Sequence, residues 1–251
     1  RLHCLWNKSV LFRWCMLMLR VKFTKENYLR YISHLDLMRL FNRSFRRANI
    51  PIKYSQGYNP QPKFSIANPL SLGIESISEY MDIELDREIS VEDFIKQMNN
   101  ELPKDIRILG GKYIEENNSL DSLVAWAYYE IKFIANNLND EKLEKMLIPW
   151  LNKEEIIIKR TRRKKGKIIE KEQNIKPLIG NIIINGQSTI DNGQLVEMNC
   201  LLRAGDGRNL KPTDLIDAMD NEINIKIDGD TLNIKRLGLY LDNNGEIQAP
   251  F

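Results

Sequence analysis

Several features that mark other protein classes are scarce in this 251-residue chain. No stretch reaches the roughly 18 consecutive apolar residues that a membrane-spanning helix needs. The three cysteines, Cys4, Cys15 and Cys200, lie far apart and form no CxxC pair. Their odd number argues against a disulfide framework and is typical of a protein in the reducing cytoplasm. We expect Cys200 to be buried in a strand.

The first 17 residues, RLHCLWNKSVLFRWCML, differ in character from the rest of the chain. Arg13 interrupts their apolar run, and no small-residue cleavage site follows, which argues against a signal peptide. We expect residues 1–17 to be an upstream extension or the product of a misassigned start, with the folded protein beginning at Met18.

Charge is nearly balanced overall, at +3, but its distribution is uneven. Residues 20–63 hold ten Lys/Arg and two acids, whereas residues 64–101 hold two Lys/Arg and nine Asp/Glu. Residues 159–167, KRTRRKKGK, hold seven Lys/Arg and no acid. Such segregation is typical of nucleic-acid-binding proteins, although segregated charges also pair with each other within a fold.

Hydrophobic periodicity predicts the same order of elements twice. The first series is strand 18–25, helix 33–49, a broken strand 63–72, strand 78–86, helix 90–102 and strand 105–115. After a polar break at 116–122 come strand 125–135, helix 139–151, a strand pair within 154–172, strand 194–204, helix 211–220 and a closing hairpin at 223–241. Both series resemble βαββαβ. We therefore predict an α+β fold of two tandem ferredoxin-like domains, 18–118 and 123–251, the second with a basic β-hairpin insertion.

The helix predicted at 33–49 is the most basic of the chain. It begins with a capping-box pattern, Ser33 followed by Asp36, and it carries four arginines: Arg39, Arg43, Arg46 and Arg47. Three of them, Arg39, Arg43 and Arg47, are four residues apart and share one face. This face either pairs with the acidic residues of 75–88 or binds phosphates.

A loop, YSQGYNPQPKFS (54–65), follows that helix, because the segment is too stiff for a helix and too rich in proline for a central strand. It contains Tyr54, Tyr58, Gly57, Pro60 and Pro62 and is bracketed by Lys53 and Lys63. The tyrosines suit stacking on unpaired bases, the glycine permits a turn that other residues avoid, and the prolines lower the entropy cost of ordering. The alternative is a crossover loop whose aromatics pack on the core. We favour one recognition surface made of loop and helix.

The strongest electrostatic signal is the segment 159–167. Its cations are Lys159, Arg160, Arg162, Arg163, Lys164, Lys165 and Lys167. The segment is either a solvated hairpin tip or an arm that contacts RNA phosphates, the interpretation we favour. Arg208 and Lys211, which follow two glycines and precede a predicted helix, form a weaker candidate anion site, with a plain loop as the alternative.

Signals for catalysis are few. His34 is the sole histidine after residue 17 and is the one candidate general acid or base, although a histidine near a helix start is more often structural. An acidic band is formed by Glu75, Glu79, Asp82, Glu84 and Asp86 and could bind Mg²⁺. The alternative is that the face shared by Asp82, Glu84 and Asp86 is simply solvated. We assign no catalytic residue, metal or cofactor.

The stretch YISHLDLMRLFNRSFRRANIPIKYSQGYNPQPKFSIANPLSLGIESISEYMDIEL (31–85) resembles the radical-SAM-linked protein family, which has no established activity and is encoded beside, or fused to, a cobalamin-binding radical SAM protein. The resemblance extends over nearly all of 18–241 and is weaker in GRNLKPTDL (207–215). Matching positions are His34, Asp36, Arg39, Arg46, Arg47, Ser55, Gly57, Asn59, Pro60, Pro62, Ser65, Gly73, Ser76, Glu79 and Asp82. In the family a basic residue or histidine often stands where this chain has Gln61, which argues against acid–base chemistry from the loop.

The resemblance implies a connection to RNA or the ribosome, because family genes often lie near those of ribonuclease G and large-subunit ribosomal proteins. The CxxxCxxC motif of radical SAM enzymes is absent, so any radical chemistry would belong to a partner. We expect a cytoplasmic accessory protein, a binder rather than an enzyme, that binds RNA or a ribosomal surface and works with a cobalamin-binding radical SAM protein. The alternatives are a metal-independent endoribonuclease resembling CRISPR repeat-processing enzymes, with His34 as acid or base, and a protein-only scaffold.

Overall fold

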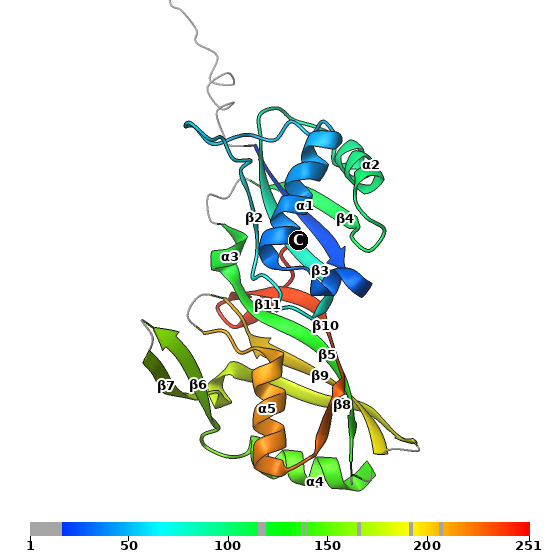
Figure 1. Ribbon diagram of the computed structural model, residues 1–251, viewed down its shortest axis with the longest axis vertical. Coiled ribbons are helices and arrows are strands. Elements are labelled where there is room, and N and C mark those ends of the chain that lie inside the picture. The colour runs from blue at the N-terminus through cyan, green and yellow to red at the C-terminus, as the bar shows by residue number, and fades with distance from the viewer. Residues whose placement is uncertain are drawn as a thin grey trace, which may run out of the picture.

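The computed structural model describes residues 17–114, 119–136, 138, 140–164, 167–190, 193–205 and 208–251 (Figure 1). Of the segment 1–17 that was expected to be an extension, residues 1–16 lie outside this description and Leu17 is the first residue of the first strand. Residues 116–118 of the polar break at 116–122 also lie outside it. No helix of the described part is long and apolar enough to cross a membrane.

Within residues 17–114 the structure describes four strands, one 3-10 helix and two α-helices. They are β1 (Leu17–Lys25), η2 (Asn27–Tyr31), α1 (His34–Arg47), β2 (Phe64–Ile66), β3 (Glu75–Leu85), α2 (Val91–Glu101) and β4 (Ile108–Ile114). The predicted helix starts are confirmed, since the hydroxyl oxygens of Ser33 and Ser90 accept hydrogen bonds from the backbone N–H groups of Asp36 and Asp93. The broken strand predicted at 63–72 is only three residues long.

The second half is richer in strands. It contains α3 (Leu120–Leu123), β5 (Val124–Ala135), α4 (Asp140–Leu151), β6 (Ile157–Lys164), β7 (Lys167–Asn174), η3 (Lys176–Leu178), β8 (Ile179–Ile190), β9 (Gly193–Arg203), α5 (Pro212–Ile223), β10 (Ile227–Asn243) and β11 (Glu246–Gln248). The closing hairpin predicted at 223–241 is wrong, because this segment is one long strand, β10. The turn-like residues of 229–232 are absorbed where the β10 register against β5 shifts between Asp228 and Asn233.

Nine of the eleven strands in the described part of the chain form one mixed sheet, and β6 and β7 pair separately. Seven of the nine run in the order β4-β1-β3-β10-β5-β9-β8, while β2 pairs with β3 and β11 pairs with β10. The two halves meet where β10 lies parallel to β3, with Lys235 opposite Glu75 and Arg236 opposite Ser76. The remaining pairings along the sheet are antiparallel. The fold is therefore α+β, with a large mixed sheet and few helices.

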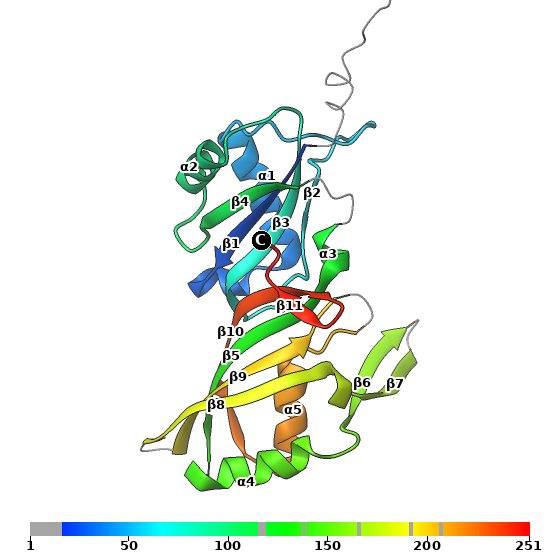
Figure 2. The same ribbon diagram turned by 180° about the vertical axis from the view of Figure 1, so that it is seen from behind.

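Helices cover one side of this sheet, as Figures 1 and 2 show from front and back. In the first half, α1 buries Leu37, Phe41 and Phe45 against the apolar face of β1 and β3. In the second half, α4 and α5 pack on the apolar residues of β5 and β9. Cys200 lies in β9 with no exposed surface, as predicted, and this burial raises the pKa of its thiol.

Candidate nucleic-acid interface

The acidic band of β3 is engaged by cations of the same chain. Its four carboxylates meet Arg30 (Glu75, 3.3 Å), Arg236 (Glu79, 2.8 Å), Arg20 (Asp82, 2.8 Å), and both Lys63 and Lys53 (Glu84, 3.1 and 3.6 Å). The alternative of a solvated face is therefore wrong for Asp82, which is 5% exposed, and Glu79 of the same band is 1% exposed. Asp86, just after the strand, is exposed. Within the described residues, no three metal-ligating side chains gather together.

The arginines of α1 do not pair with that band. Arg39 contacts Asp36 at 3.1 Å, and Arg47 donates to both the carboxylate and the carbonyl oxygen of Glu101 in α2, each at 2.8 Å. Of the face predicted for Arg39, Arg43 and Arg47, Arg47 is therefore paired with an acid of α2. Arg43 and Arg46 are exposed and form no hydrogen bond or ion pair with the described chain. These two are the arginines of α1 that are free to bind an external anion.

The start of α1 is electrostatically satisfied by its own residues. The Ser33 hydroxyl group, followed by the Arg39 guanidinium group, lowers the pKa of the Asp36 carboxyl group by hydrogen bonding to its charged form. An anion from outside would meet this carboxylate at the first turn of the helix. The phosphate-binding potential of α1 therefore lies in its second half.

The loop at 54–65 is built on a short stem. Tyr54 and Pro62 form an isolated bridge, and the Ser55 N–H donates to the Gln61 carbonyl oxygen at 2.8 Å. The Gln61 N–H donates in turn to the Ser55 hydroxyl at 2.9 Å. Gly57 has φ of +138°, as expected for the turn predicted there. The residues Gly57–Pro60 thus form a tip held by a closed stem.

The two tyrosines of the loop have different environments. Tyr54 is half-buried and packs against the core of the first half, as the crossover alternative required. Tyr58 is fully exposed at the tip. At the base of the stem, Lys53 and Lys63 share the single carboxylate of Glu84, so this trio retains one net positive charge. Tyr58 is consequently the aromatic side chain of this loop that is available for stacking.

Strands β6 and β7 form a separate two-stranded sheet, called here the basic arm (residues 157–174). Lys159 is exposed without a hydrogen bond or ion pair to the described chain, whereas Arg160 donates to Asp214 at 2.6 Å and to the Asn209 carbonyl oxygen at 3.2 Å. The backbone of Arg162, Arg163, Lys164 and Lys167 lies in the strands. Lys165 lies outside the described residues.

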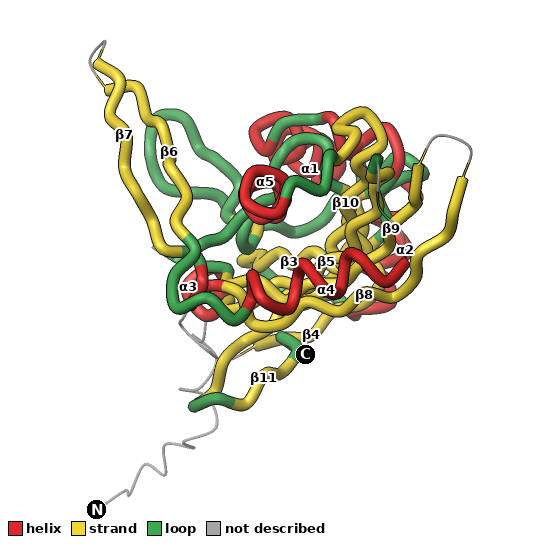
Figure 3. The backbone as a smooth tube through the Cα atoms, turned by 90° about the horizontal axis from the view of Figure 1, so that it is seen from below, coloured by secondary structure: helices red, strands yellow, loops and turns green. Residues whose placement is uncertain are grey.

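The contact from Arg160 to Asn209 brings two further predicted cations beside the base of the basic arm. Arg208 and Lys211 flank Asn209, and both are exposed without an ion pair to the described chain. Figures 1 and 3 show that the basic arm and the loop at 54–65 project toward the same side of the molecule, one from each half. The basic arm and the loop at 54–65 were separate candidates in the sequence analysis, and in the folded chain they project to one side of the molecule.

The candidate general acid or base, His34, is the first residue of α1. Its side chain is exposed at the start of α1 and has no hydrogen-bond partner in the described chain. It borders a cavity of about 10 Å³ together with Lys25 and Glu79. Lys25 is 2% exposed, and burial lowers the pKa of its ammonium group. Sequence reasoning missed Lys25, because a single lysine in a strand carries no signal of burial.

The residues that matched the family pattern fall into two groups. Several hold the fold: Gly73 has φ of +83° and donates to the Arg30 carbonyl oxygen, the Ser76 hydroxyl accepts from the Ser78 N–H, and Glu79 and Asp82 are buried in ion pairs. Others are exposed: Asn59 and Pro60 in the loop tip and Ser65 in β2. Much of the pattern therefore specifies structure.

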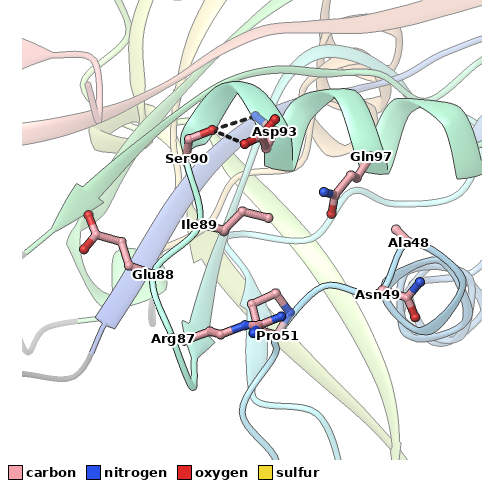
Figure 4. A pocket seen from close by; sticks show the side chains of 9 residues that line it. All are labelled: Ala48, Asn49, Pro51, Arg87, Glu88, Ile89, Ser90, Asp93 and Gln97. Atoms are coloured by element: carbon pink, nitrogen blue, oxygen red, sulfur yellow. Dashed lines mark hydrogen bonds between the residues drawn. The ribbon is translucent and has the colours of Figure 1, made fainter.

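A groove of about 710 Å³ opens between the end of α1 and the start of α2 (Figure 4). Its lining residues are Ala48, Asn49, Pro51, Arg87, Glu88, Ile89, Ser90, Asp93 and Gln97. Arg87 is exposed and has no ion pair within the described chain. Nothing in the sequence singles out these residues, because they meet only when α1, the end of β3 and α2 are folded together.

Comparison with known proteins identifies a family. The sequence profile described as "Uncharacterized protein conserved in bacteria (DUF2344)" matches residues 18–212. A solved structure titled "Crystal Structure of a Cbf5-Nop10-Gar1 Complex" is similar over 87% of this chain and 47% of the other, with 10% sequence identity and a TM-score of 0.47. The present chain thus spans about half of that one, and a likeness this distant carries no functional argument. No curated protein matches.

Proposed function

The chain belongs to the DUF2344 family of uncharacterized proteins conserved in bacteria, and we propose that it is an RNA-binding accessory protein. Its contact surface comprises the second half of α1, the loop at 54–65, the basic arm and the segment 208–211. The observation that carries the proposal is the set of exposed cations, from both halves of the chain, that form no ion pair with the described residues. Two projections on one side of the molecule, the loop at 54–65 and the basic arm, support it.

Ion pairing separates the cations of this protein into two classes. Cations of the first class form ion pairs with carboxylates of β3 or α2. An RNA phosphate would have to displace these carboxylates in order to bind these cations. Arg43, Arg46, Lys159, Arg208 and Lys211 are exposed without such a partner, so they are free to replace the counterions of a phosphate backbone. Tyr58 adds an exposed ring on which an unpaired base can stack.

The proposal also includes a protein partner and a cellular compartment. The resemblance to the radical-SAM-linked family supports a cobalamin-binding radical SAM protein as the enzyme to which the RNA, or a ribosomal surface, is presented. The strand orders β4-β1-β3-β2 and β10-β5-β9-β8 support interpreting each half as a ferredoxin-like unit. Such a protein would work in the cytoplasm, where its RNA and its reduced thiols are found.

The proposal is tested by crosslinking and sequencing the RNA bound to the protein in its own host. The test variant is Arg43→Glu/Arg46→Glu, because these side chains are free of internal partners. The matched control is Lys96→Glu/Lys104→Glu, which changes the net charge equally on α2 and the turn that follows it. We expect a discrete set of RNAs that is retained in the control and lost in the test variant.

Two outcomes would contradict the proposal. If wild type recovers no enriched RNA and shows no RNA binding even at low salt, where phosphate contacts are strongest, the surface does not serve RNA. If both variants lose RNA equally, overall charge rather than this surface determines binding. In the first case, co-purification of a partner protein that survives nuclease treatment would favour the scaffold alternative.

A further inference from the structure

We propose that the groove between α1 and α2 holds one unpaired base of the RNA strand whose phosphates bind α1. This inference rests on the proposed function and adds a base-binding site to it. The groove volume of about 710 Å³ lies within the roughly 300–1,000 Å³ range of small-molecule sites, so a nucleoside fits.

The walls of the groove are fixed before any ligand arrives. The Asp86 N–H donates to the Pro51 carbonyl oxygen at 2.9 Å, which ties the segment after α1 to the end of β3. The backbone of Ile89 is held at both its N–H and its carbonyl by the Tyr113 hydroxyl, at 3.1 and 2.8 Å. Because these contacts are already made, a base would enter without ordering the surrounding chain.

The groove offers an apolar surface and free amides, which is the combination a base requires. Ile89 and Pro51 supply apolar atoms for the face of a ring, and Figure 4 shows Ile89 and Gln97 directed into the groove. The side-chain amides of Gln97 and Asn49 form no hydrogen bond within the described chain. An amide carries a donor and an acceptor together, and so matches the edges of bases.

The charges of the lining residues favour the base, rather than the phosphate, of a nucleotide inside the groove. Glu88 and Asp93 belong to the lining, and Asp93 is the carboxylate that receives the Ser90 hydroxyl at the start of α2. These acids disfavour a phosphate inside the groove. Arg87 runs along the lower edge toward Pro51, as Figure 4 shows, and Arg46 lies three residues before Asn49 on α1. A neutral base inside the groove avoids repulsion by Glu88 and Asp93, and phosphates at the rim are attracted by Arg87 and Arg46.

The test compares oligonucleotides of about ten nucleotides, a length suited to single-strand binders. The four homopolymeric RNAs present a base at every position, whereas an abasic ribose-phosphate strand of equal length retains the backbone alone. The variant Asn49→Gly/Gln97→Ala removes both amides. Glycine tolerates the φ of +51° found at Asn49, and alanine suits the exposed helical position of Gln97. Thermal unfolding confirms that both proteins are folded.

We expect the variant to lose about tenfold in affinity for at least one homopolymer, the order of one base contact, and to bind the abasic strand as wild type does. The matched variant Arg43→Ala/Arg46→Ala should weaken binding of both kinds of strand. Equal affinity of wild type and Asn49→Gly/Gln97→Ala for all four homopolymers would overturn the base site while leaving the RNA surface in place. Failure of wild type to bind any strand would instead overturn the proposed function itself.

Discussion

Arg43 and Arg46 form no hydrogen bond or ion pair with the described chain, which makes the salt dependence of RNA binding quantitatively predictable. Each phosphate contact with a single strand contributes about 0.7 to the slope of log affinity against log salt. The variant Arg43→Ala/Arg46→Ala should therefore have a slope shallower by about 1.4 than that of wild type.

The magnitude is large enough to measure. Between about 50 and 200 mM salt, a slope difference of 1.4 corresponds to roughly sevenfold, so the variant should lose about seven times less affinity than wild type over this range. Fluorescence anisotropy of a labelled single-stranded RNA, recorded at several salt concentrations, gives both slopes directly. The measurement needs no knowledge of the natural RNA, because phosphate contacts are largely independent of sequence.

The control separates local contact from overall charge. Lys96→Ala/Lys104→Ala removes the same two charges from α2 and the turn after it, and should leave the slope within about 0.3 of wild type, since cations that touch no phosphate release no counterions. An unchanged slope in the Arg43→Ala/Arg46→Ala variant, or equal changes in both variants, would refute the assignment of phosphate contacts to α1.

Three further predictions concern the fold and the loop. Arg20→Met leaves the buried Asp82 carboxylate without its bidentate partner and should lower the free energy of unfolding by about 3–5 kcal/mol; a loss below about 1 kcal/mol in urea titrations would contradict this. Ser33→Ala removes the main cause of the lowered Asp36 pKa, so NMR titration should show that pKa rising, and stability that wild type loses as pH falls through the carboxyl pKa should be lost at a higher pH. Gly57→Ala strains the tip at φ of +138° and should weaken RNA binding several-fold while leaving the midpoint of thermal unfolding nearly unchanged, because the tip is remote from both cores.

Local patterns predicted much of the fold. Strand alternation identified the regions of β1, β3, β4, β5 and β9, and the Ser-x-x-Asp spacing correctly placed the starts of α1 and α2. These features depend on neighbouring residues, so a single sequence contains them. The strand β8 was missed, because its sequence IGNIIINGQSTI mixes apolar and polar residues without strict alternation and has two glycines. Long-range pairing with β9 makes it a strand.

The candidate interface was predicted less completely, for a physical reason. The sequence shows which residues are cationic, but ion pairing depends on which carboxylate lies within about 4 Å after folding. Arg47 was predicted either to pair with the acids of 75–88 or to bind phosphates, and it contacts Glu101 instead. Arg160 was predicted to lie in a solvated tip or a phosphate-binding arm, and it contacts Asp214. Only the folded chain distinguishes them from Arg43, which lies four residues before Arg47 in the same helix.

The position of β10 in the sheet has a consequence for how the protein is made. This strand begins at Ile227, in the last tenth of the 251-residue chain, yet it pairs with both β3 and β5. Before β10 is synthesised, therefore, β3 and β5 each have an edge without its partner strand. At that stage Glu79 also lacks the Arg236 guanidinium group that balances its charge. Exposed strand edges are sites of aggregation. A nascent chain that does not yet include β10 would therefore depend on chaperones to stay soluble.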